Sequence, residues 1–180
     1  SLEIKKELAI SVIYDLKKNA KVGIIAFDTE PKIISDLGFL VNKDLTALEQ
    51  AIRSIEIGGR TFIGSGMQGA MDMLKKASGS KNVILISDGR SQHISEVVCD
   101  TARDKPEERR MFGKKSQQQQ QQCINEAIIN RAVEAFGIKF FTLGIGGTTN
   151  EYYMQVMAQE GNGAYFRIEE AKKLKILFGD

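Results

Sequence analysis

Two separated segments of this sequence carry side chains that could bind one metal ion. The first, residues 58–66, is rich in glycine and places Thr61 just before a helix-forming stretch. The second, residues 82–89, is an apolar strand pattern that ends in Asp88. Ligands of open α/β sheets bind at the carboxyl ends of the strands, and hydroxyl and carboxylate oxygens are hard ligands suited to Mg²⁺, Mn²⁺ or Ca²⁺. We therefore predict that Thr61 and Asp88 are ligands of one divalent cation.

Both candidate ligands also have a simpler structural explanation. The Thr61 hydroxyl could stabilise a turn or cap a helix, and an Asp followed by Gly is common in turns. With only these two ligands the affinity for a cation would be poor. Glycines near the two ligands would let the backbone approach the ion; they are Gly58, Gly59, Gly64 and Gly89.

The same residues permit a second interpretation, in which the chain binds a dinucleotide. Residues 64–69 have the pattern G-x-G-x-x-G, and Asp88 follows Gly69 by 19 residues. This is the spacing of the NAD(P)-binding fingerprint, whose acidic residue holds a ribose hydroxyl. Against it, residues 60–63 are short for the strand that should precede the glycines, and helices and strands already come before them. An NAD(P)-binding Rossmann domain is therefore the alternative function, and it predicts saturable NAD(P) binding.

The composition excludes several other functions. The chain has 180 residues, 42% of them hydrophobic and 27% charged, which fits one soluble-type globular domain. A net charge of +2 gives no reason to expect a nucleic-acid or membrane partner, and no apolar run approaches the roughly 20 residues that span a bilayer. His93 is the only histidine and we find no acid–base pair, so we expect no enzyme. Nothing selects a cellular compartment.

Strand patterns alternate with helix patterns, which predicts a doubly wound, mostly parallel sheet with helices on both faces. Pro31 precedes an antiparallel edge strand, and Asp44 can cap a helix. We expect helices over residues 2–20, 45–55, 67–77, 124–136, 150–158 and 169–177, and strands over 21–28, 32–37, 81–87, 138–145 and 164–168. The first of these strands, KVGIIAFD, is apolar enough to be buried on both faces.

Residues 92–122 interrupt this alternation with a polar segment that ends in six glutamines. Low hydrophobicity and a homopolymer tract are typical of disorder. We therefore expect one domain over residues 1–180 that carries a disordered, glutamine-rich insertion at 92–122. Because the insertion follows the strand of Asp88, it should emerge beside the candidate site, as a tolerated surface loop or as a loop that binds a partner.

Taken in order, the motifs of this chain resemble the von Willebrand factor type A domain. The resemblance rests on VGIIAFD, GGRTFIGSGM, VILISDG, GIKFFTLGIGG and MAQEGNGAYFRIEEAKKL, and the last of these looks most like bacterial and archaeal members. It implies a metal-ion-dependent adhesion site made by an Asp-x-Ser-x-Ser motif, a Thr and an Asp, to which Thr61 and Asp88 correspond. Ser1 would be the last residue of that motif or lie just past it, and is the third candidate ligand. The implied function is a protein-interaction or adhesion module that binds an acidic side chain of a partner protein through Mg²⁺, Mn²⁺ or Ca²⁺.

The resemblance also implies that a central strand, which carries the Asp-x-Ser-x-Ser motif in the family, does not lie within these residues. The strands at 21–28 and 81–87 would then flank a gap, and each buried unpaired backbone group would cost roughly 1–3 kcal/mol. An alternative is that residues 175–180, KILFGD, fill the gap in a permuted arrangement, with Asp180 opposite Thr61 and Asp88.

Overall fold

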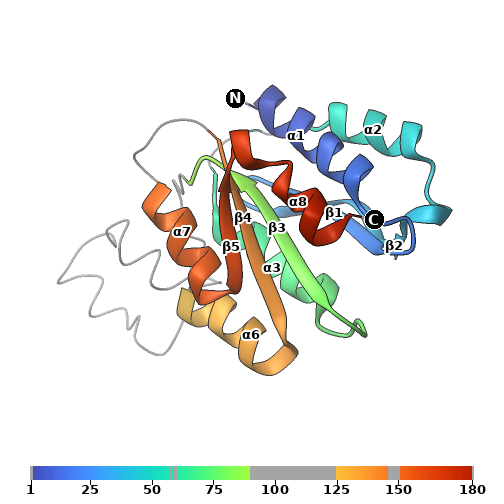
Figure 1. Cartoon of the computed structure of the whole chain (residues 1–180). Helices are drawn as coiled ribbons and strands as arrows, with labels where there is room; N and C mark the ends of the chain where they lie inside the picture. Colours follow the sequence, from blue (N-terminus) through green and yellow to red (C-terminus); the bar gives the residue numbers. More distant parts are fainter. Residues whose placement is uncertain (1, 57, 59–60, 90–124, 146–150, 180) are drawn as a thin grey trace.

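The computed structural model describes residues 2–56, 58, 61–89, 125–145 and 151–179 (Figure 1). The predicted insertion at 92–122 lies outside these residues, as do Ser1, Gly59 and Asp180. None of the described helices is long and apolar enough to cross a membrane. In chain order the elements are α1 (Leu2–Asp15), β1 (Lys21–Phe27), β2 (Pro31–Phe39), η1 (Leu40–Asn42), α2 (Leu45–Arg53), α3 (Ile63–Leu74), β3 (Lys81–Ser87), η2 (Asn125–Ile129), α6 (Asn130–Phe136), β4 (Ile138–Gly144), α7 (Glu151–Glu160), β5 (Asn162–Arg167), η4 (Ile168–Glu170) and α8 (Lys173–Phe178).

Three parallel strands in the order β3-β4-β5 form the larger sheet, as Figure 1 shows. Their register places Ser87 beside Gly144 and Gly144 beside Arg167, so the three carboxyl ends meet at one edge. Side chains alternate between the two faces of a strand. One face packs against α1 and α8, and the other against α3, α6 and α7. The prediction of a doubly wound α/β fold with helices on both faces is therefore confirmed.

The smaller sheet is the antiparallel hairpin of β1 and β2, which confirms the predicted edge strand after Pro31. The prediction that the first strand is buried on both faces is wrong: residues 22–27 are only half-buried. Among the described residues β1 pairs with β2 alone, and it forms no ladder with β3. Within the described ranges no strand joins β1 to β3, in line with what the family resemblance implied.

Two helices hold the separate sheets together from opposite faces. On one face, Ile10 and Ile13 of α1 cluster with β1 and α2, while Val12 of the same helix clusters with alternate residues of β3. On the other face, α3 packs against Phe27 of β1 and against Val83 of β3. The core is therefore continuous through the helices, although the strands are not continuous through hydrogen bonds.

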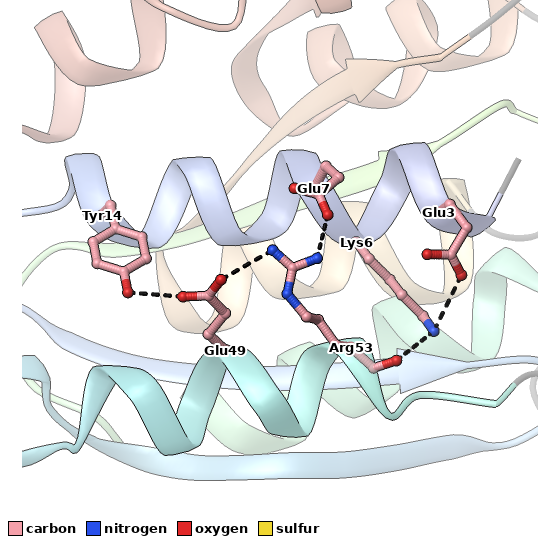
Figure 2. Close-up of polar contacts among 6 residues, drawn as sticks. All are labelled: Glu3, Lys6, Glu7, Tyr14, Glu49 and Arg53. Atoms are coloured by element: carbon pink, nitrogen blue, oxygen red, sulfur yellow. Dashed lines mark hydrogen bonds and ion pairs between the residues drawn. The ribbon is translucent and has the colours of Figure 1, made fainter.

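Polar contacts tie α1 to α2, as Figure 2 shows. Lys6 of α1 donates to the carbonyl oxygen of Arg53, the last residue of α2, at 2.7 Å. The Arg53 guanidinium in turn pairs with Glu7 and, at 2.9 Å, with Glu49. Glu49 also accepts the Tyr14 hydroxyl at 2.9 Å. These contacts fix the end of α2, from which the chain runs toward the candidate site.

Some predicted boundaries hold and others do not. Asp44 caps α2 by accepting the N–H of Ala47 at 3.1 Å, and Gly137 ends α6 with φ 65°, both as the sequence indicated. The permuted strand is wrong, because residues 173–178 form helix α8 and bury Leu174. The expected glycine-rich turn at 58–66 is too long, because α3 already begins at Ile63.

Candidate metal centre

Asp88 lies where the sequence placed it, directly after β3 at the carboxyl edge of the larger sheet. The chain turns there, because Gly89 has φ 78° and its N–H donates to the Ser87 hydroxyl at 3.0 Å. The chain therefore bends at Gly89, and Asp88 is half-exposed at the sheet edge. Asp88 can belong to this bend and still be a metal ligand.

Thr61 immediately precedes the first turn of α3 and is half-buried. The N-cap of this helix is Phe62, which makes no side-chain capping bond. Within the described part of the chain, the Thr61 hydroxyl has no hydrogen-bond partner. The simpler explanation of Thr61 as a helix cap is therefore wrong, because Phe62 occupies that position.

The path of α3 brings Thr61 to the same end of the molecule as Asp88. This helix packs on β3 and is joined to it by the short connection 75–80, so the two elements run in opposite directions and the start of α3 lies near the end of β3. At its own start, the N–H of Phe62 donates to the carbonyl oxygen of Asp28, which follows β1, at 2.7 Å. The carboxyl ends of β1 and β3 therefore flank the start of α3.

Asp28 is a residue at this edge that the sequence analysis did not single out. The N–H of Glu30, which its carboxylate accepts at 3.0 Å, holds the pKa of Asp28 below its usual value. Burial opposes this effect, and the N–H groups of Thr29 and Gly58 add smaller contributions in the same direction as Glu30. The sequence contains a signal that could have identified Asp28. It ends an apolar strand run, just as Asp88 does.

The glycines near the candidate site have different roles: Gly64 and Gly66 allow close packing, whereas Gly89 adopts a positive φ of 78°. A side chain at Gly64 would meet the Phe62 ring, and one at Gly66 would come within 2.5 Å of the Phe27 ring. Gly58 has open space around it, and Gly59 is not among the described residues. The G-x-G-x-x-G pattern lies inside α3 and does not follow a strand, so the strand–turn–helix context of a dinucleotide fingerprint is absent from the described structure.

A second polar cluster occupies the same edge at the ends of β5 and α7. Glu151 accepts the Tyr165 hydroxyl at 3.0 Å and Arg167 Nε at 2.5 Å. Arg167 therefore lowers the pKa of Glu151, and burial, followed by the bond to Glu151, raises the pKa of Tyr165. Glu151 is therefore engaged by two neighbours, Tyr165 and Arg167.

The two candidate ligands are of the type that a hard cation binds, but they are too few to fill its coordination sphere. Thr61 and Asp88 supply a hydroxyl and a carboxylate, which are oxygen ligands of the type that Mg²⁺ prefers. The described residues contain no group of three or more His, Cys, Asp or Glu that could hold a metal. The remaining ligands would be water, a partner's carboxylate or residues beyond the described ranges, among which is Ser1.

Comparison with known proteins identifies what this architecture is similar to. An aerotolerance-related membrane protein from Bacteroides fragilis, solved with multiple mutations to serines, is 21% identical with a TM-score of 0.62; the match covers 98% of this chain and 85% of that one. A von Willebrand factor type A protein from Catenulispora acidiphila is 15% identical with a TM-score of 0.67, over 98% of this chain and 36% of that one.

A third similar structure holds a metal. Proximal thread matrix protein 1 from the mussel byssus, described with a zinc-occupied MIDAS motif, is 16% identical with a TM-score of 0.59, over 98% of this chain and 41% of that one. At these identities the likeness concerns the fold. No curated protein matches the sequence. The sequence pattern of the von Willebrand factor type A domain matches residues 2–180, and the chain therefore belongs to the von Willebrand factor type A domain family.

Proposed function

We propose that this domain is a protein-interaction module, not an enzyme, that binds an acidic group of a partner protein through a divalent cation. Thr61 and Asp88 hold the cation, and Ser1 is the third candidate ligand. The observation that carries the proposal is the Thr61 hydroxyl, which has no hydrogen-bond partner in the described residues and lies at the sheet end where Asp88 also lies. Membership of the family and the zinc-occupied MIDAS motif of the mussel protein support it.

The chemistry of the two ligands explains why a partner's carboxylate would bind. A cation held by a neutral hydroxyl and one carboxylate keeps most of its positive charge, so a further anionic oxygen is attracted to it. Mg²⁺ binds six oxygens and commonly keeps several waters, and a partner's Glu or Asp would replace one of them. Mn²⁺ and Ca²⁺ accept the same kind of ligand and are the alternatives to Mg²⁺.

Thermal unfolding followed by circular dichroism tests the cation site. A ligand that binds only the native state at about 100 times its Kd adds roughly 2.7 kcal/mol, which for a chain of this size raises the Tm by roughly 5–10 °C. We expect this rise on changing from EDTA to millimolar Mg²⁺. The substitutions Asp88→Ala and Thr61→Val should abolish it, whereas Asp36→Ala, which removes an exposed acid from β2, should retain it.

Two results would contradict the proposal. The wild-type transition could stay at the same temperature in EDTA, Mg²⁺, Mn²⁺ and Ca²⁺, which would mean that this chain holds no cation. Alternatively, the Asp88→Ala variant could respond to metal as the wild type does, which would place the cation elsewhere.

A further inference from the structure

The main chain of Asp28 connects the end of β1 to the segment that carries Thr61. Its carbonyl oxygen accepts the N–H of Phe62 at 2.7 Å and lies 3.5 Å from the Ser65 hydroxyl. That hydroxyl, which is buried, also donates to the Phe62 carbonyl oxygen at 2.9 Å. Because Phe62 directly follows Thr61, these bonds fix the backbone on one side of the candidate ligand.

The carboxylate of Asp28 fixes the turn from which that carbonyl projects. It accepts the N–H of Glu30 at 3.0 Å, while the N–H of Asp28 donates to the Glu30 carbonyl oxygen at 3.2 Å. The Asp28 carboxylate therefore holds the turn, and the Asp28 carbonyl oxygen contacts the chain directly after the candidate ligand.

Packing around this point leaves the start of α3 little freedom. The Phe62 and Ile63 side chains are fully buried. A side chain at Gly66 would come within 2.5 Å of the Phe27 ring, so α3 approaches β1 as closely as the absence of a side chain allows. The position of Thr61 therefore depends on the end of β1, and Asp28 is the residue that makes the polar contacts there.

We propose that Asp28 is a positioning residue of the cation site, which holds the Thr61 hydroxyl at the carboxyl edge without itself binding the ion. This inference rests on the proposed function. The carboxylate already accepts the N–H of Glu30, so Asp28 supports the segment behind a ligand through hydrogen bonds and does not bind the ion. Substitution of such anchors typically costs about 10–100-fold in metal affinity.

Titration calorimetry with MgCl₂ on the whole chain measures this effect. We expect Asp28→Ala to weaken Mg²⁺ binding by about 10-fold or more. Asp28→Asn keeps an oxygen that accepts the N–H of Glu30 but removes the charge, so it should stay within about threefold of the wild type, close to 0.7 kcal/mol. Asp36→Ala removes one exposed acid of β2 and should leave the affinity unchanged.

The outcomes distinguish a positioning role of Asp28 from direct ligation of the ion and from an effect of its charge. Unchanged affinity in Asp28→Ala would overturn the inference. An equal loss in Asp28→Asn and Asp28→Ala would also overturn it, because charge or direct ligation would then be the cause. Circular dichroism establishes that each variant is folded, and if the Ala variant is not, a loss in the folded Asn variant still contradicts the inference.

Hydrogen exchange of the Phe62 amide separates this inference from the proposed function. We expect that amide to exchange faster in Asp28→Ala than in the wild type and in Asp28→Asn, whether or not metal is present, because the turn that presents the Asp28 carbonyl is loosened. If the wild type binds no Mg²⁺, the proposed function fails, and unchanged exchange in Asp28→Ala would then show that Asp28 does not position this segment either.

Discussion

The buried amine of Lys6 allows a quantitative test of how α1 is held on α2. Its side chain is only 8% exposed, and its Nζ donates to the carbonyl oxygen of Arg53 at 2.7 Å (Figure 2). The Glu3 carboxylate lies 3.5 Å from the same amine but is 78% exposed, so that ion pair contributes little. We predict that Lys6→Met, which keeps the length of the apolar stem and removes the donor, destabilises the fold.

The magnitude follows from these contacts. A hydrogen bond from a charged donor contributes about 1.5–3 kcal/mol to stability. The pair between Glu3 and Lys6 on one helix adds at most about 0.5 kcal/mol. We therefore expect a loss of about 2–3 kcal/mol, and a corresponding fall in Tm of roughly 4–12 °C.

Urea unfolding followed by circular dichroism measures the loss, provided that the slope of the transition is unchanged. Tyr14→Phe is the matched control, because it removes one hydrogen bond at the other end of the same interface, where Tyr14 is 47% exposed. A surface change of this kind should cost less than about 0.5 kcal/mol. If Lys6→Met cost no more than the control, the amine would not be an essential donor to α2.

Three further predictions concern the strands and the carboxyl edge. Gly163→Ala should destabilise by about 2 kcal/mol or more in urea unfolding, because a side chain there would collide with the backbone of β4, whereas Gly58→Ala, which meets nothing, should be neutral. One edge of β1 pairs with no described strand, and exposed apolar strand edges pair with other chains, so Ile24→Lys on β1 should reduce self-association in sedimentation velocity; unchanged association would place the contact elsewhere. Arg167 lowers the pKa of Glu151, so this pair stabilises the fold above the ordinary Glu pKa of about 4.3 and loses its effect as the pH falls through the lowered value; an acid-unfolding curve of Glu151→Gln should show a smaller loss of stability below that pH than the wild type.

The family and the order of elements were predictable from the sequence because they depend on local patterns. Apolar runs of strand length, helical periodicity and signals such as Asp44 and Gly137 act over a few residues, and the structure confirms them. Asp88 was placed correctly at the end of its strand for the same reason. Local patterns failed at the start of α3, where Gly64 and Gly66 indicated a turn but are helical residues whose lack of a side chain permits close packing.

Tertiary structure alone decided three features: where Thr61 lies relative to the helix start, what Asp28 contacts, and how far β1 is exposed. Thr61 does not cap the helix, because α3 begins one residue later than a cap at Thr61 would require, and the N-cap is Phe62. Asp28 reaches Phe62 through a contact between residues 34 positions apart, which no local pattern reports. The apolar sequence of β1 determined that it is a strand, but burial depends on what pairs with its edge. Sequence thus determined which segments form and where their polar ends lie, whereas contacts between distant segments determined how those polar ends are held in place.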